Sequence, residues 1–235
     1  LHYPLRRQRQ MCIRDSLETE SLKHKVPIVK IPKGYQPRAA LGFSLITLLC
    51  VLNKINLVNS NFIDKIVDAT KSLYQYMDEF CKEEGLAASI AKNINNSIIA
   101  IYGVENSTDH IASRLRAQIA ENSKMLTSFN VVPEMNHNEI LGWRTNTDDL
   151  SVIFLQNDDD FYRNKLRVSI NKKIIQKYNP KIIEINSFGN SKLEKTLYLV
   201  HLTDWISWFL SELNNVDSIE IDVINYLKSE LSKIN

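Results

Sequence analysis

The stretch SIIAIYG, Ser97–Gly103, decides the fold of this chain, because it is a continuous apolar run that ends at a glycine. Such a run is typical of a strand buried on both faces of a parallel sheet. A helix is predicted next, from about Thr108 to Asn122, followed by a short strand in NVVPE, Asn130–Glu134. A strand, a helix and another strand in succession form a right-handed parallel unit. The sequence therefore predicts an α/β domain.

The same alternation continues towards the C-terminus. Strands are predicted in LSVIFLQN, Leu150–Asn157, and in KIIEINSFG, Lys181–Gly189, on either side of a helix over residues 158–178. Two further helices are expected at about Lys192–Leu213 and Asp217–Leu231. The pattern predicts a doubly wound parallel sheet flanked by long helices, in which ligands bind at the carboxyl ends of the strands. The glycine that ends the first strand is not part of a GxGxxG motif, so no dinucleotide fingerprint is present.

The segment before this sheet differs in character. KVPIVKIP, Lys25–Pro32, alternates apolar and polar residues and predicts a strand, the last of a preceding domain. An apolar helix is predicted over residues 36–56, with Pro37 in its first turn, and an amphipathic helix over 61–82. The longest apolar run, Ala39–Leu52, has 14 residues. A membrane span needs about 20, so a buried helix and no membrane partner are expected.

The first fifteen residues, LHYPLRRQRQMCIRD, resemble a translated transposase-type sequencing adapter, because ATG TGT ATA AGA GAC encodes MCIRD. We therefore expect residues 1–15 to be foreign and the natural protein to begin further upstream. The alternative is a genuine basic N-terminal arm. The segment carries a net charge of +3, so without it the chain changes from +2 to −1. Basicity then no longer favours nucleic-acid binding.

The composition and the cysteine spacing exclude several classes of protein. The 235 residues are 44% hydrophobic and 24% charged, which suits a globular domain with a sizeable core. Three cysteines, Cys12, Cys50 and Cys81, show no paired spacing. This excludes a disulfide framework and a zinc motif, and it favours a reducing, cytoplasmic setting. No metal or cofactor is expected, because no cluster of metal-ligating residues is visible.

Two polar clusters are the candidates for chemistry. ENSK, Glu121–Lys124, ends the first predicted helix of the sheet, and PEMNHNEILGW, Pro133–Trp143, follows the next strand. Glu121 and His137 are 16 residues apart, and we expect both to face one cleft, where a carboxylate and an imidazole can move protons. The alternatives are a fraying helix end with a Glu–Lys surface pair and an asparagine-capped turn.

The motifs PKGYQPRAALG, ENSK…PEMNHNEILGW and VINYLKSEL resemble the bifunctional phosphoglucose/phosphomannose isomerase family, a branch of the sugar isomerase (SIS) superfamily. The resemblance runs from about Lys25 to the C-terminus. It implies a SIS-type, flavodoxin-like three-layer sandwich. It also implies three parts: a remnant of a truncated first SIS domain at 16–35, a helical connection at 36–84, and a second SIS domain at 85–235.

The resemblance implies a role for four residues. Glu121 would be the base that moves a proton between C2 and C1, and His137, contributed to the site of a partner subunit in a homodimer, would help to open the sugar ring. Lys228 would be the other ring-opening group, although a lysine on a last helix is usually just solvent-exposed. Arg38 would stabilise the enediolate, because arginine keeps its charge; its alternative is a helix cap or interface charge.

Three further residues are candidate substrate-binding groups. Ser218 is predicted to cap the last helix, and the family implies that a hydroxyl near it touches the sugar. Asn136 and Asn138 flank His137 and are expected to orient its loop. Glu134 and Glu139 are expected to be structural or to support the residues that touch the substrate.

The implied activity is interconversion of glucose 6-phosphate or mannose 6-phosphate with fructose 6-phosphate through a cis-enediolate, without a cofactor. The family binds phosphate on glycine-rich loops of its first domain, and nothing like SGNT occurs here. We therefore expect this C-terminal part to have very little activity alone. One alternative is a non-catalytic SIS module that senses sugar phosphates. Another is a helix-rich scaffold that docks through residues 36–56 and 61–82.

Overall fold

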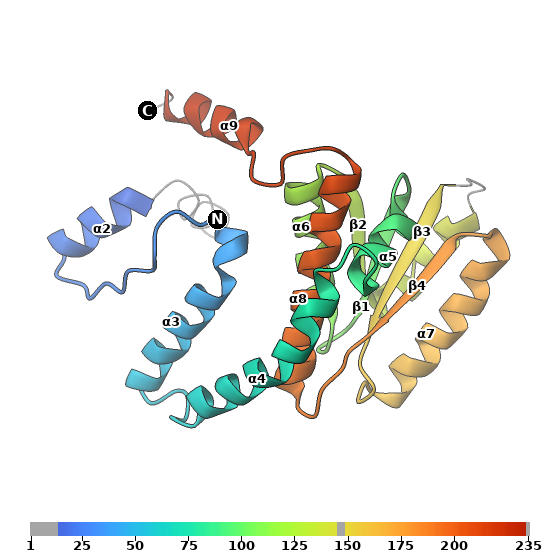
Figure 1. The fold of residues 1–235 in the computed structure, drawn as a ribbon, viewed down its shortest axis with the longest axis horizontal. Helices are drawn as coiled ribbons and strands as arrows, with labels where there is room; N and C mark the ends of the chain where they lie inside the picture. The colour runs from blue at the N-terminus through green and yellow to red at the C-terminus, as the bar shows by residue number, and fades with distance from the viewer. Residues whose placement is uncertain (1–13, 145–148, 234–235) are drawn as a thin grey trace. The chain divides into compact units, whose positions relative to one another are not determined.

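The computed structural model describes residues 14–144 and 149–233, and it divides into two compact units (Figure 1). One unit consists of residues 1–60 and 220–235, and the other of residues 61–219. Residues 1–13, most of the expected adapter, lie outside the described residues. The larger unit contains the sheet.

The sheet has four parallel strands in the order β2-β1-β3-β4. They are β1 (Ile98–Val104), β2 (Thr127–Val132), β3 (Leu150–Gln156) and β4 (Lys181–Asn186). The chain leaves β1 towards one side of the sheet and β3 towards the other. Right-handed crossovers then place the connections on opposite faces, which confirms the doubly wound sheet.

Each face of the sheet has its own apolar core. Four helices contribute to the first face: α4 (Phe62–Phe80), α5 (Leu86–Ile94), α6 (Asp109–Ser123) and α8 (Lys192–Leu213). The second face is covered by α7 (Tyr162–Ile175), which continues into η4 (Gln176–Tyr178), and by the 3-10 turns η2 (Glu134–Asn136) and η3 (Glu139–Arg144). Side chains alternate along β1, so Ile99 and Ile101 belong to the first core while Ala100 and Tyr102 belong to the second.

The junction between β1 and α6 explains how the sequence sets this arrangement. The hydroxyl of Thr108, the N-cap residue, is fully buried; it accepts the Val104 N–H (2.9 Å) and donates to the Leu155 carbonyl (2.7 Å). It therefore ties the end of β1 to β3 and to the start of α6. A side chain at Gly103 would place its Cβ 2.6 Å from the Cα of Asp109. Only glycine allows the helix to start this close to the strand.

The smaller unit contains α2 (Arg14–Lys23), η1 (Pro37–Ala40), α3 (Leu41–Lys54) and α9 (Asp222–Ser232). Pro37 opens the 3-10 turn before α3, as expected. The expectation of a buried helix is wrong, because no residue of α3 is buried and Leu48 is 54% exposed. The prediction of a strand at Lys25–Pro32 is wrong: the segment has no strand within the described residues, and Val26 and Val29 are 55% and 60% exposed. An alternating pattern becomes a strand only when a neighbouring strand pairs with it.

The division into units differs from the predicted domain boundaries. Helix α4 groups with the sheet, whereas α9 groups with residues 1–60. The assignment of 16–35, 36–84 and 85–235 therefore stays a prediction. Within the described residues, no helix is long and apolar enough to cross a bilayer.

Candidate active site

Glu121 lies in the last turn of α6 and is half-buried. The helix ends at Lys124, which adopts a left-handed conformation (φ 58°) and whose ammonium donates to the Glu121 carbonyl at 2.8 Å. The two residues between them are tied to α8: Asn122 Nδ2 donates to Ser207 Oγ (2.9 Å), and Ser123 Oγ donates to the Ser207 carbonyl (2.7 Å). A fraying helix end is therefore excluded, and ENSK is a fixed helix terminus.

His137 lies between two 3-10 turns and is exposed. The segment around it is anchored in the second core by Met135, which is fully buried, and by Trp143, which is 4% exposed. The imidazole is thus presented to solvent on a backbone that is packed on both sides. That arrangement suits a group that acts on a ligand outside its own core.

A partly buried polar network supports the second half of this segment. Tyr102 donates from its hydroxyl to Glu139 Oε1 (2.9 Å) and accepts from Trp143 Nε1 (2.9 Å), while Asn130 Nδ2 donates to Glu139 Oε2 (2.6 Å). Burial, followed by the nearby charge of Glu139, raises the pKa of Tyr102 well above its ordinary value, so the phenol stays a donor. Glu139 is therefore a structural residue, as predicted.

The two asparagines beside His137 orient the segment. Asn136 Nδ2 donates to Asn171 Oδ1 on α7 (2.5 Å), and the Asn138 Oδ1 accepts the Glu139 N–H (2.5 Å). This agrees with the expectation that they shape the loop. Their predicted contact with substrate stays a prediction.

The topology separates Glu121 from His137 within one chain, which corrects the expectation of a shared cleft. Thr127, four residues after the end of α6, pairs with Ile99 near the start of β1, so Glu121 lies at the amino edge of the sheet. His137 follows the other end of β2 and lies at the carboxyl edge. At about 3.3 Å per residue, β2 separates the two edges by roughly 17 Å. The prediction failed because the helix of a parallel unit runs back along its strand.

The other predicted residues lie outside the two segments that contain Glu121 and His137. Arg38, in η1, and Lys228, in α9, belong to the smaller unit, and both are half-buried. Ser218 is not a helix cap, because α9 begins at Asp222 with Ile221 as its N-cap. Ser218 instead lies in a turn in which Asp217 Oδ1 accepts the Ile219 N–H at 2.7 Å.

Within residues 14–144 and 149–233, no group of three or more His, Cys, Asp or Glu side chains could hold a metal ion. A cavity of about 260 Å³ lies beside the His137 segment, over Tyr102, Glu139 and Trp143. The Tyr102 hydroxyl in its wall bonds to both Glu139 and Trp143. Most of its other lining residues, such as Ile98, Ala100 and Leu150, are apolar.

Comparison with known proteins identifies the family of this chain. Residues 83–231 match the model of the bacterial phospho-glucose isomerase C-terminal SIS domain. The chain belongs to this family.

Curated relatives of this SIS family member include two bifunctional phosphoglucose/phosphomannose isomerases. The one from Aquifex aeolicus (strain VF5) is 38% identical over 208 residues, which cover 88% of this chain and 62% of the relative. The one from Caldicellulosiruptor bescii is 35% identical over 213 residues, covering 88% and 63%. The chain thus spans under two-thirds of the length of these relatives.

Solved structures share the SIS fold. A hypothetical protein from Thermus thermophilus has a TM-score of 0.70 at 12% identity, over 92% of this chain and 59% of that one. A glucose-6-phosphate isomerase like protein from the same organism has a TM-score of 0.58 at 15% identity, over 77% and 59%. At these identities the likeness concerns the fold alone.

The polar side chains that attach α6 to α8 were not identified from the sequence. Arg114, Gln118 and Asn122 recur at every fourth residue of α6, and this spacing was a usable signal for a polar stripe. Their partners Asp204 and Ser207 are about ninety residues away in the sequence. No local pattern could have paired them.

Proposed function

We propose that this chain carries the catalytic groups of an aldose–ketose isomerase that acts on hexose 6-phosphates. Membership of the phospho-glucose isomerase family and the names of the two bifunctional relatives support this reading. The substrates would be glucose 6-phosphate or mannose 6-phosphate, interconverted with fructose 6-phosphate.

The reaction is a proton transfer between neighbouring carbons. In the open-chain aldose, the Glu121 carboxylate removes the proton from C2, the electron pair forms the C1–C2 double bond, and the negative charge moves onto O1 to give the enediolate. The proton of the C2 hydroxyl then moves to O1, Glu121 returns its proton to C1, and O2 becomes the carbonyl oxygen of the ketose. Before this, His137 and Lys228 exchange protons with the ring oxygen and the anomeric hydroxyl to open the ring. The guanidinium of Arg38 balances the charge of the enediolate.

The position of Glu121 and His137 at opposite edges of the sheet is the observation that supports the proposal most directly. Both are held by bonded, packed backbone, yet roughly 17 Å of strand separates their edges. A base and a ring-opening group at this distance serve one sugar only if they come from two copies of the chain. The proposed site is therefore shared in a homodimer.

The test is complementation between two inactive variants. Glu121→Gln removes the base and His137→Ala removes the ring-opening group, and each is expected to lower kcat by about a hundredfold or more. When the two variants are mixed and allowed to reassort, half of the dimers contain one intact site. About a quarter of the wild-type turnover should return, followed as loss of the C2 proton by NMR in deuterated water.

The assay compares two preparations. The chain by itself is expected to turn over little, because remote phosphate binding drives such reactions. The second preparation joins to this chain the portion of the Aquifex aeolicus relative that the chain does not match, and we call it the extended enzyme. His110→Ala is the control, since His110 is an exposed histidine on α6. No recovery on mixing would refute the shared site, and an extended enzyme that binds sugar phosphate without turnover would identify a sensor.

A further inference from the structure

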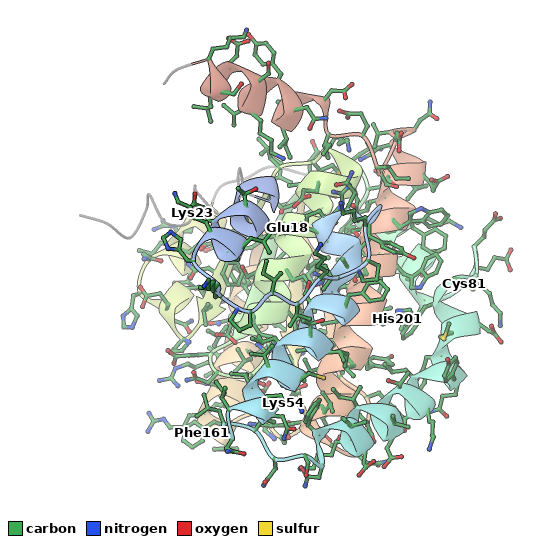
Figure 2. The ribbon with its side chains drawn as sticks, turned by 90° about the vertical axis from the view of Figure 1, so that its left-hand side faces the viewer. Glu18, Lys23, Lys54, Cys81, Phe161 and His201 are labelled. Carbon is green, nitrogen blue, oxygen red and sulfur yellow. The ribbon has the colours of Figure 1, made fainter. Side chains whose placement is uncertain are left out.

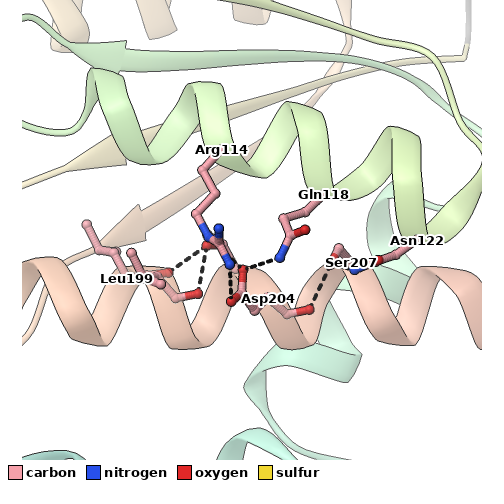
Figure 3. A network of polar contacts seen from close by, with 8 residues as sticks. Arg114, Gln118, Asn122, Leu199, Asp204 and Ser207 are labelled. Carbon is pink, nitrogen blue, oxygen red and sulfur yellow. Dashed lines mark hydrogen bonds and ion pairs between the residues drawn. The ribbon is translucent and has the colours of Figure 1, made fainter. Parts of the chain in front are cut away.

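Helix α6 is attached to α8 by a polar clamp centred on Asp204 (Figure 3). Asp204 Oδ1 accepts from Arg114 Nε (3.1 Å) and from Gln118 Nε2 (2.8 Å), and its Oδ2 accepts from Arg114 Nη2 (2.7 Å). The side chains of Arg114 and Asp204 are 19% and 33% exposed, and Gln118 is buried. The guanidinium therefore engages both carboxylate oxygens, which fixes direction as well as distance.

The clamp continues to the end of α6. Ser207 Oγ donates to the Asp204 carbonyl (2.8 Å) and accepts from Asn122 Nδ2, so one turn of α8 receives bonds from three turns of α6. Asn214 Nδ2 then donates to the Ser123 carbonyl at 3.0 Å. As Figure 3 shows, Arg114, Gln118 and Asn122 all reach from α6 towards α8.

The side chain of Glu121 leaves α6 in nearly the same direction as that of Arg114. Glu121 is seven residues after Arg114, and seven residues are nearly two full helical turns, so both side chains leave the helix in almost the same direction. A change in the rotation of α6 that moved Arg114 would move Glu121 by the same angle. For a carboxylate about 6 Å from the axis, a rotation of 20° is a displacement of about 2 Å.

We propose that Asp204 is a positioning residue for Glu121: it fixes the rotation of α6 on α8 and thereby the place of the base. This inference rests on the proposed function, because the position of Glu121 matters to turnover only if Glu121 is the base. Catalytic groups need placement to within about 0.5 Å, and an error of about 1 Å can cost about a hundredfold in rate. The displacement that the clamp prevents is larger than this tolerance.

Apolar packing alone does not supply this constraint. Ile111, Leu115 and Ile119 of α6 lie in the same core as Leu202 and Ile206 of α8, and that contact holds the helices together. Hydrophobic attraction is non-directional, so it permits rotation and sliding that a bidentate ion pair forbids. A half-buried ion pair contributes little to stability but can fix a register. The two interactions therefore have separate roles, which makes the inference testable.

The first test measures position in the chain itself, independently of activity. Asp204→Asn keeps the shape of the side chain and removes its charge, whereas Asp204→Glu keeps the charge and lengthens the arm. The matched control is Glu184→Gln, which breaks the Lys172–Glu184 pair (2.7 Å) between α7 and β4. Crystal structures superposed on the four strands should show the Glu121 carboxylate displaced by about 1–2 Å in Asp204→Asn and unmoved in the control.

Hydrogen exchange tests in solution whether the end of α6 is loosened in Asp204→Asn. The amides of residues 119–124 should exchange about tenfold faster in Asp204→Asn than in Glu184→Gln, while strand amides exchange alike in both. If Glu121 stays in place and these amides stay protected in Asp204→Asn, the proposal is overturned.

The second test uses the extended enzyme and separates the two ideas. Asp204→Asn should lower kcat by about tenfold to a hundredfold with KM nearly unchanged, and Asp204→Glu should recover part of the loss. A displaced Glu121 together with full turnover in Glu121→Gln would refute the proposed base but leave the clamp intact. A dead Glu121→Gln together with a wild-type kcat in Asp204→Asn would refute the positioning role and leave the base intact.

Discussion

The two residues that the proposed mechanism needs most are held by networks of different construction. The α6–α8 clamp below Glu121 pairs a guanidinium with a carboxylate, and both side chains keep some contact with water. The network behind His137 is centred on more deeply buried side chains: Tyr102 is 1% exposed and Trp143 is 4% exposed, while Glu139 is half-buried. Its carboxylate, Glu139, receives hydrogen bonds from a phenol and an amide rather than from a cation in the described part of the chain.

The difference in burial predicts a difference in what each network does. Where water can replace a lost partner, removing one group costs little free energy but frees the helix to move. Where water cannot enter, the same removal leaves a buried polar group without a partner, at about 1–3 kcal/mol each. The clamp is thus suited to position, and the Tyr102 network to stability.

Tyr102→Phe should produce the largest loss of stability. It removes the hydroxyl that Glu139 and Trp143 share, so the buried Trp143 N–H loses its acceptor and the half-buried Glu139 carboxylate loses a donor. We expect the free energy of unfolding to fall by about 2–3 kcal/mol. Urea unfolding followed by tryptophan fluorescence measures it, since Trp143 reports directly on this site.

Tyr226→Phe is the control for that substitution, because Tyr226 is 68% exposed on α9. It should change the free energy of unfolding by less than about 0.5 kcal/mol. If Tyr102→Phe lowered the free energy of unfolding no more than this control or than Asp204→Asn, the Tyr102 network would not differ from the clamp in its contribution to stability.

Gly103→Ala should have an intermediate effect, at the other end of α6 from the clamp. The new methyl group would meet backbone atoms of Asp109 at 2.6–2.7 Å, so the start of the helix must shift. We expect a loss of about 1–3 kcal/mol, measured as a shift in the urea midpoint. Gly42→Ala is the matched control: it lies in α3 with nothing within 4 Å, and should be neutral or stabilising by about 0.5–1 kcal/mol. Equal effects at both glycines would mean that the close approach does not constrain α6.

Much of the fold could be predicted because its signals are local. The helix Lys192–Leu213 was predicted with the bounds that the structure has, and the strand at Leu150 differs by one residue at its end. Buried strands and capped helices carry their periodicity and end signals within a few residues. The second strand was predicted too late, at Asn130 rather than Thr127, because its half-buried start lacks a continuous apolar run.

The candidate site was only partly predictable, because its geometry depends on distant pairing. ENSK and PEMNHNEILGW were found as motifs, but their placement at opposite edges follows from the parallel register of β1 and β2. The Lys25–Pro32 strand failed for a related reason, since a pattern does not reveal whether a neighbouring strand exists. Asp204 was missed because its role lies in a partner ninety residues away.

A substitution of His201 should have the smallest effect on stability, and it tests the surroundings of Asp204 in the α6–α8 clamp. His201, which is labelled in Figure 2, lies on α8 one turn before Asp204. The centroid of its ring is 5.4 Å from the centroid of the Phe80 ring. Its Nε2 is buried without a hydrogen-bond partner in the described part of the chain. Burial lowers the pKa of His201, and the charge of Asp204 opposes this in part.

The sign of the pH effect follows from that shift. Because the folded-state pKa is lower than the unfolded value of about 6.5, the unfolded chain binds the proton more readily. The His201 contribution is therefore constant above about pH 7, and the free energy of unfolding falls as the pH drops below about 6.5, until the folded-state pKa is passed. In His201→Gln this decline should be weaker in urea titrations between about pH 8 and pH 5. His110→Gln, at an exposed histidine, should keep the wild-type slope. A weaker decline in Asp204→Asn than in the wild type would contradict the assignment, because removing the carboxylate removes the charge that favours protonated His201.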